Sequence, residues 1–300
     1  MKKGEITLQE ISKLFNYELI GNDLIINGLN LCNRDSKQDS IISYITSSKY
    51  IKCIRQNPKI KLTFLTSDLY DLMKEEFTNI SFFVVDNPEE KFYELHNYLY
   101  DYTNFYDHYD FDKNIGSNCV IHNSVQIENG VLIGNNVVIG QNSIIKKGSI
   151  IGDGTHIGCG SIIGSEGFQL IHDKSGINKL IRHVGGCRLG KSVSIGDCTT
   201  ICNSLFEDTT LIGDDTKIDN LVHIAHNCII GNNCVLTAGV ILSGSTIIGS
   251  NVWISPNSSV SNKVILEDNS FIGIGSVVLN KVKTGTKIFG NPGRKIDFNK

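Results

Sequence analysis

The chain has 300 residues, of which 40% are hydrophobic and 20% charged, a composition typical of globular proteins. Its net charge of −3 gives no strong field toward nucleic acid or anionic membranes. No apolar run approaches the ~18 residues of a spanning helix, and we expect no secretory signal behind Met1–Glu5. The nine cysteines form no C-x-x-C pair, which predicts reduced thiols and a cytoplasmic location.

Helix and strand patterns alternate in residues 1–110, which predicts a small α/β domain. Leu8, Ile11, Leu14 and Phe15 have helical spacing. Ser67 is a plausible N-cap for a helix over 68–77. The remaining predicted elements are strands over 41–45, 61–66 and 81–86 and a helix over 88–100.

An aliphatic residue recurs at every sixth position from residue 115 onward. These anchors run from Ile115 to Ile163, resume from Leu189 to Ile201, and continue from Ile212 to Val278, giving 24 hexads. Gly often directly follows the anchor, and Asn or Asp often occupies the two positions after that glycine. Because Gly, Asn and Asp tolerate positive φ, we expect tight corners there. The 29 glycines and only four prolines of the chain fit such a regular array.

A period of six is the signature of the hexapeptide β-helix. Three hexads make one triangular coil, so the array predicts about eight coils stacked ~4.8 Å apart. The predicted fold is mainly β: a left-handed parallel β-helix over 111–283, preceded by the α/β domain and followed by a tail, 284–300. An ordinary β-sandwich has 8–12-residue strand spacing and fits the period poorly.

The period is interrupted twice. Residues 165–188 lie outside it, and an excursion of this length from a regular array is usually a functional loop. A second, smaller break lies near Phe206–Thr210.

His226 is the residue that best fits acid–base chemistry. It stands two residues after an anchor, and Gly244 lies 18 residues, one coil, further on. A base beside an accessible backbone N–H is the arrangement for attack on a carbonyl. His183 and His223 suggest an alternative three-histidine metal site, but His223 and His226 would point to opposite faces of a strand. We therefore expect no metal and no permanently bound cofactor.

Two segments of the β-helix resemble the UDP-3-O-acylglucosamine N-acyltransferase (LpxD) family of lipid A synthesis. Gly164–Phe168 is similar to the family's G-S-D-G-F, and Ile218–Asn227 is similar to its I-D-N…I-A-H-N segment. The resemblance implies that His226 is the catalytic base, that the Gly244 N–H is the oxyanion donor and that Asn227 shapes the site. The substrate-binding residues that we place in these segments are Glu166, Phe168, Asp219 and Asn220.

The N-terminal domain carries a third similarity. Asp39–Tyr50 resembles the family's nucleotide-base-binding segment, in which an aromatic residue, an Asn and a Tyr hold uracil. The matching positions are Tyr44, Ser47 and Tyr50, with Ser in place of Asn. The resemblance implies a nucleotide-linked amino sugar as acceptor, and both UDP and dTDP stay open.

The chain departs from the family in two places. Cys202–Ser204 stands where the family has D-R-G, and Gly290–Lys295 resembles the G-N-P-x-[KR] tail of CoA-dependent sugar acetyltransferases in place of a helical extension. Acyl-CoA and acyl carrier protein therefore both stay open as the donor. The candidate donor-binding residues are Arg182, Arg188, Lys283, Arg294 and Lys295.

Together these features predict transfer of an acyl group, with 3-hydroxyacyl among the candidates, to a sugar amine in lipid A or surface-polysaccharide synthesis. A flat prism face forms no deep cleft, so we expect a homotrimer with sites between subunits. An acetyl-CoA-dependent O-acetyltransferase and a non-enzymatic scaffold are the alternatives. The N-terminal domain argues against the first, and His226 with the loop argues against the second. We expect no nucleic-acid partner.

Overall fold

The computed structural model describes residues 4–173 and 175–296, so the last four residues of the predicted tail lie outside it. The chain divides into two compact units. Unit 1 comprises Met1–His108 and Gln169–Val184, and unit 2 comprises Tyr109–Phe168 and Gly185–Lys300. Within the described residues, no helix is long and apolar enough to cross a bilayer.

Unit 1 is built on a five-stranded sheet whose order is β2-β7-β6-β5-β4. The last four strands in this order are mutually parallel, and β2 is antiparallel to β7. The strands are β2 (Leu19–Ile20), β4 (Gly28–Leu29), β5 (Ile41–Tyr44), β6 (Ile60–Leu65) and β7 (Ser81–Val84). A separate antiparallel pair is β1 (Ile6–Thr7) with β3 (Ile25–Ile26). The predicted strands are thus confirmed to within one or two residues.

The helices of unit 1 are α1 (Leu8–Phe15), η1 (Ser48–Tyr50), α2 (Ile51–Gln56), α3 (Ser67–Met73) and α4 (Pro88–Tyr102). A capping box between Thr7 and Glu10 starts α1. The prediction that Ser67 caps the third helix is wrong, because Thr66 occupies the N-cap and Ser67 is already helical. Asn87 caps α4 by accepting from the Glu90 N–H.

The hairpin of β17 (Leu170–His172) and β18 (Asn178–Leu180) belongs to unit 1, whereas the sequence placed the whole loop 165–188 with the β-helix. Hydrogen bonds to α4 explain the difference. The Asn97 side chain donates to the Leu180 carbonyl at 3.0 Å and accepts from the Arg182 N–H at 3.0 Å.

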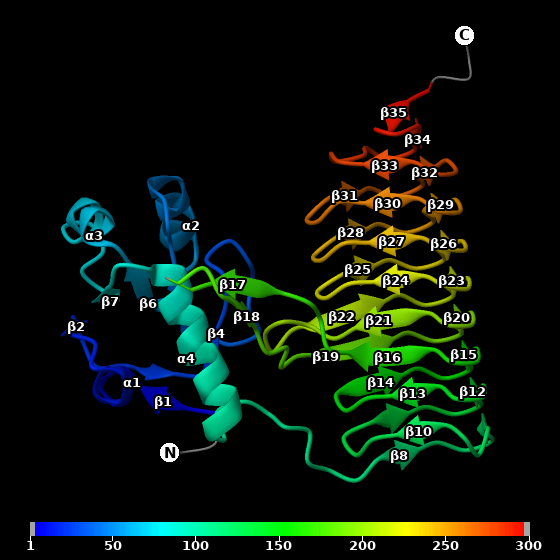
Figure 1. Cartoon of the computed structure of the whole chain (residues 1–300), viewed down its shortest axis with the longest axis horizontal. Coiled ribbons are helices and arrows are strands. Elements are labelled where there is room, and N and C mark those ends of the chain that lie inside the picture. The colour runs from blue at the N-terminus through cyan, green and yellow to red at the C-terminus, as the bar shows by residue number, and fades with distance from the viewer. Residues whose placement is uncertain (1–3, 174, 297–300) are drawn as a thin grey trace. The chain divides into compact units, whose positions relative to one another are not determined.

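Unit 2 is a parallel β-helix with three sheets, and Figure 1 shows its short strands stacked in successive rungs. The first sheet, here the β24 sheet, contains β10 (Gln126–Ile127), β13 (Ile144–Ile145), β16 (Ile162–Ser165), β21 (Thr200–Cys202), β24 (His223–Ile224), β27 (Ile241–Leu242), β30 (Ser259–Val260) and β33 (Val277–Val278). The β25 sheet contains β8 (Asn114–Ile115), β11 (Leu132–Ile133), β14 (Ser149–Ile151), β19 (Gly186–Leu189), β22 (Thr209–Ile212), β25 (Ile229–Ile230), β28 (Ile247–Ile248) and β31 (Ile265–Leu266).

The third sheet, here the β23 sheet, contains β9 (Val120–Ile121), β12 (Val138–Ile139), β15 (His156–Ile157), β20 (Ser194–Ile195), β23 (Lys217–Ile218), β26 (Val235–Leu236), β29 (Trp253–Ile254), β32 (Phe271–Ile272), β34 (Lys287–Phe289) and the antiparallel β35 (Arg294–Lys295). Because β34 pairs in parallel with β32, the coils continue beyond residue 283 into the predicted tail.

The anchors fill the interior of the β-helix, as the period predicts. Ile224 is paired with Leu242 on the next coil, and both side chains are fully buried. Ile115, on the first coil, is 42% exposed because no coil lies beneath it. Stacked aliphatic side chains therefore supply one continuous hydrophobic core along the axis.

The corners differ from the prediction. Positive φ occurs three residues after the anchor, as at Asn136 and Asn227, and, except at Gly164, not at the glycine that directly follows the anchor. Those glycines allow close approach of adjacent coils: a Cβ on Gly134 would lie 2.8 Å from the Asp153 backbone nitrogen. The expectation that these glycines form the left-handed corners is therefore wrong, although Asn and Gly do form them.

Candidate active site

His226 follows β24 at the corner that leads from the β24 sheet to the β25 sheet. Its side chain is half-buried. The pairing of β24 with β27 places residue 244 beside it on the next coil. A Cβ on Gly244 would lie 2.6 Å from His226 Nε2, so the imidazole ring rests directly against the glycine. The structure thus brings together the two residues that the sequence predicted as base and oxyanion donor.

The Gly244 N–H lacks the side-chain hydrogen bond that some of its counterparts on other coils make. At the same position after the anchor, the Lys191 N–H donates to Asp214 Oδ1 at 2.8 Å, and the Ser250 N–H donates to Asp268 Oδ1 at 2.7 Å. Among the described residues, no hydrogen bond from the Gly244 N–H is present. A backbone donor of this kind can stabilise negative charge that develops on a reacting oxygen.

Asn227 sets the tautomer of His226. The Leu205 N–H can only donate, and it lies 3.0 Å from Asn227 Oδ1, which fixes the orientation of the amide. The same Oδ1 lies 2.9 Å from His226 Nδ1 and must accept from it. In its neutral form His226 therefore carries its proton on Nδ1 and a lone pair on Nε2, the nitrogen that faces Gly244.

The backbone at Asn227 is held in the geometry that this contact requires. Its φ of 59° is left-handed, which Asn tolerates. Its N–H donates to Thr210 Oγ1 at 2.9 Å, and Thr210 is fully buried. Sequence reasoning found His226, Gly244 and Asn227 but missed Thr210 and Leu205, although the break near 206–210 pointed to this segment.

Cysteine chemistry does not compete with His226 at this corner. Cys202 and Cys228 are buried in the prism interior. Burial raises the pKa of the Cys202 thiol to about 11 and that of Cys228 to about 12. Both are therefore neutral near pH 7 and poor nucleophiles.

The predicted base-binding residues lie in unit 1 where β5 ends. The Tyr44 hydroxyl donates to Glu89 Oε1 at 2.9 Å, and its ring packs against Phe92 at 5.0 Å between centroids. Burial raises the pKa of Tyr44 well above its usual range. Ser47 and Tyr50 flank the turn that follows, with the Tyr50 N–H donating to the Ser47 carbonyl at 3.1 Å. The carboxyl ends of parallel strands are the usual ligand-binding edge of such sheets.

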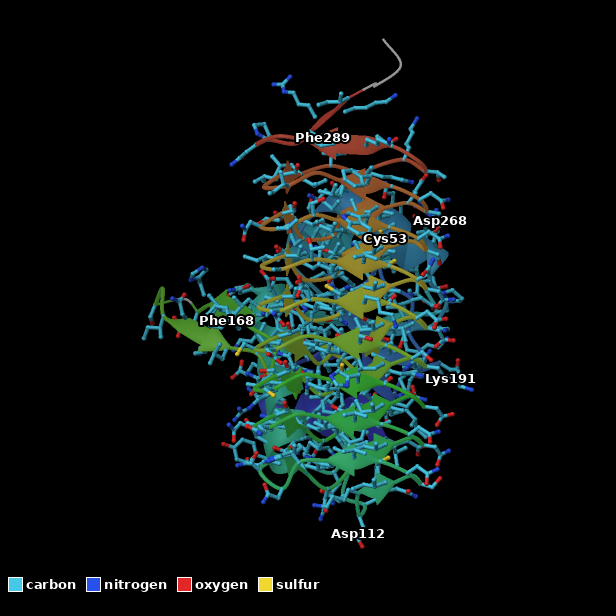
Figure 2. All side chains as sticks on the ribbon, turned by 90° about the vertical axis from the view of Figure 1, so that its right-hand side faces the viewer. Cys53, Asp112, Phe168, Lys191, Asp268 and Phe289 are labelled. Atoms are coloured by element: carbon cyan, nitrogen blue, oxygen red, sulfur yellow. The ribbon has the colours of Figure 1, made fainter. Side chains whose placement is uncertain are left out.

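The other substrate candidates lie elsewhere on unit 2. Phe168, the last residue of unit 2 before β17, is 77% exposed and is labelled in Figure 2. Glu166, two residues before it, is also exposed. Asp219 and Asn220 lie one corner earlier than His226, after β23, where Asn220 Oδ1 accepts from the Asp197 N–H at 2.6 Å. Within one chain, the structure does not bring these two residues to His226.

The basic donor candidates are also separated. Arg182 belongs to unit 1 and pairs with Asp101 at 3.1 Å. Arg188 points outward from β19. Lys283, Arg294 and Lys295 are exposed at the C-terminal end of the β-helix, near which Figure 2 labels Phe289.

The three-histidine alternative has no support from geometry within a unit. His183 lies in unit 1, where its Nδ1 is 3.0 Å from the Ile181 carbonyl oxygen. His223 is on β24, and burial lowers its pKa. In the described part of the chain, no group of three His, Cys, Asp or Glu residues could hold a metal ion.

The sequence matches the bacterial transferase hexapeptide family (six repeats) over residues 112–147, 130–165 and 209–244. The last match contains both His226 and Gly244. The chain therefore contains hexapeptide repeats. A UDP-3-O-acylglucosamine N-acyltransferase from Campylobacter curvus is 37% identical over 127 residues, which cover 42% of this chain and 40% of the relative. A protein of the same name from Helicobacter pylori is 45% identical over 83 residues, covering 28% and 24% of the two chains.

A crystal structure of LpxA, a UDP-N-acetylglucosamine acyltransferase from Bacteroides fragilis, is similar in fold with a TM-score of 0.56. It is 25% identical, and the match covers 64% of this chain and 71% of that one. Hexapeptide repeats and such neighbours confirm the predicted left-handed β-helix. The sequence matches span less than half the length of the curated relatives.

Proposed function

We propose that this protein transfers an acyl group from a thioester to the amine of a nucleotide-linked amino sugar. The observation that carries the proposal is the His226–Gly244 pair, in which a base nitrogen and a backbone donor flank one point on the surface. The curated relatives are named for N-acyl transfer to a UDP-sugar, which supports the same reaction class here.

The reaction needs one proton to move twice. The sugar amine attacks the thioester carbonyl while His226 Nε2 accepts the proton that the amine loses. The Gly244 N–H stabilises the tetrahedral oxyanion, a contribution of about 3 kcal/mol for one such donor. The C–S bond then breaks, the imidazolium returns the proton to the leaving thiolate, and the products are an amide and a free thiol.

A nucleotide handle would position the amine through binding energy remote from the reacting atoms. Tyr44, Ser47 and Tyr50 are the residues that we propose for the base, with the Tyr44 ring already held by Glu89 and Phe92. Relatives named for UDP-sugars favour UDP over dTDP. The lipid A pathway is the proposed setting, and the cytoplasm is the proposed compartment.

Acyl-CoA and acyl carrier protein are the two proposed donors. Both carry phosphate, which exposed Lys283, Arg294, Lys295 and Arg188 would attract. We set Arg182 aside, because its guanidinium pairs with Asp101.

We propose a homotrimer whose contact surface is the outer face of the β25 sheet. Leu132, Ile150, Ile229 and Ile247 point outward from this sheet and are 38%, 40%, 44% and 40% exposed. Arg188 stands in the same outward column between Ile150 and Leu211, and the column is otherwise apolar from Leu132 to Ile265, which is typical of a subunit interface. Ile229 lies three residues from His226, so a second copy on this face would border the candidate active site.

Sedimentation of an Ile229→Lys/Ile247→Lys variant tests the assembly. The variant should sediment as a monomer and lose activity, whereas Val120→Lys, an exposed change on the β23 sheet, should leave the trimer intact. A wild-type chain that is monomeric and fully active would contradict the proposal.

Substrate screening tests the reaction. UDP- and dTDP-linked amino sugars should stabilise the protein by about 2.7 kcal/mol at a hundredfold excess over Kd. Mass spectrometry should then detect an amide product with acyl-CoA or acyl carrier protein. Acylation of a hydroxyl only, in sugars without an amine, would favour the O-acetyltransferase alternative. The absence of any turnover with any pair would favour the scaffold.

A further inference from the structure

The second interruption of the hexad array forms a short buried segment beside the candidate active site. The anchor Ile212 lies eleven positions after the anchor Ile201, where a regular hexad has an offset of six. Ser204 and Leu205 are fully buried in this insertion, and Phe206 is 1% exposed. A surface bulge without a role would leave such side chains in solvent, so the insertion is packed into the fold.

The backbone of Ser204 is fixed on both sides. Its N–H donates to the Gly186 carbonyl at 3.2 Å, and its own carbonyl accepts from the Gly185 N–H at 3.0 Å. A Cβ on Gly185 would lie 2.0 Å from the Phe206 carbonyl oxygen, so only glycine allows this approach. Ser204 is therefore held in one position relative to the preceding coil.

The side chain of Ser204 meets the amide of Asn227. Asn227 Nδ2 donates to Ser204 Oγ, and the Leu205 N–H donates to Asn227 Oδ1 at 3.0 Å. Both ends of the amide are thus held by consecutive residues of the insertion. The amide in turn receives the Nδ1 proton of His226 at 2.9 Å.

We propose that Ser204 is a positioning residue that keeps His226 in the tautomer with its proton on Nδ1. This inference rests on the proposed acyl transfer. Without the Ser204 hydroxyl, Asn227 Nδ2 loses its buried acceptor, the Leu205 N–H alone holds the amide, and a fraction of the molecules rotates the amide to recover an acceptor for Nδ2. Rotation withdraws Oδ1 from His226 Nδ1, and the imidazole then populates the tautomer with its proton on Nε2, which cannot accept a proton from the amine.

Nitrogen NMR of the imidazole in the full-length protein tests the proposal without any substrate. The His226 signals are identified by their loss in His226→Ala. In the wild type they should show a protonated Nδ1 and an unprotonated Nε2, and in Ser204→Ala they should shift toward the opposite tautomer. An unchanged tautomer in a folded Ser204→Ala protein would overturn the proposal.

Ser161→Ala is the matched control. Ser161 is also a fully buried serine that makes two hydrogen bonds, but it lies at a different corner, where it donates to the Gly196 carbonyl at 2.7 Å and accepts from the Thr199 N–H at 3.0 Å. Both variants should lower thermal stability. Only Ser204→Ala should change the His226 tautomer, and it should lower kcat about tenfold with KM within twofold.

The two readouts separate the two hypotheses. If the wild type transfers no acyl group to any acceptor, the proposed function fails, while the tautomer comparison still decides the role of Ser204. If Ser161→Ala and Ser204→Ala lower kcat equally and neither moves the tautomer, Ser204 is structural and the proposal is wrong.

Discussion

Two histidines, one in each unit, show how surroundings decide what an imidazole can do. His96 on α4 is fully buried in unit 1. Its Nε2 lies 2.9 Å from the Arg182 carbonyl, which can only accept, so Nδ1 accepts from the Tyr106 hydroxyl at 2.7 Å. Both ring nitrogens of His96 therefore make hydrogen bonds that stabilise unit 1. His226 uses Nδ1 for Asn227 and presents Nε2 toward Gly244. The two histidines differ in the groups that their second nitrogen faces, a backbone carbonyl for His96 and Gly244 for His226.

Among changes to the surroundings of these two histidines, Gly244→Ala should produce the largest loss of kcat. The added Cβ would lie 2.6 Å from His226 Nε2 and push the ring away from its position. We expect a loss of ~100-fold or more in kcat. The glycine has no left-handed φ, so alanine fits the backbone, and the melting temperature should stay within a few degrees. An alanine variant with full activity would show that the ring and the N–H do not act together.

The His96 site predicts a loss of stability in acid. Burial lowers the pKa of His96 to about 4, whereas an unfolded imidazole titrates near 6.5. Between these values the unfolded chain binds the extra proton, so stability is full above ~6.5 and falls as the pH drops toward 4, by up to about 3 kcal/mol. Hydrogen exchange of the α4 amides at pH 7, 5.5 and 4.5 measures this loss of stability. Protection that does not change over this range would contradict the assignment.

Replacing His96 should separate stability from activity. His96→Phe leaves the Arg182 carbonyl and the Tyr106 hydroxyl without their imidazole partner, at a cost of about 2 kcal/mol. Chemical denaturation followed by circular dichroism measures the change. At 25 °C the folded variant should keep its kcat within twofold. A kcat loss comparable to that of Gly244→Ala would assign His96 a role in the reaction.

The sequence predicted the β-helix well because a stacked coil repeats one set of contacts. Each anchor packs on the residue 18 positions away, so the period alone specifies the pairing, as between Ile224 and Leu242. The same arithmetic placed Gly244 beside His226. Which hexad position turns the corner was not predictable in this way, because Gly is favoured both by positive φ and by close contact between coils.

The contacts that orient His226 could not be predicted, because they come from where the period fails. Ser204 and Leu205 belong to an insertion, and no spacing rule relates an insertion to the coil above it. The hairpin β17–β18 was missed for the same reason, since its assignment to unit 1 depends on bonds to Asn97 that are distant in sequence. The interruptions indicated where to look but not which atoms meet.

The most direct test of the central claim is the turnover number of His226→Ala with a UDP-linked amino sugar and an acyl thioester. His156→Ala, which removes an exposed imidazole from β15, is the control. We predict a fall of about a thousandfold in kcat for His226→Ala, with an unchanged circular dichroism spectrum and wild-type turnover in the control. Wild-type turnover in a folded His226→Ala protein would contradict the assignment of His226 as the base.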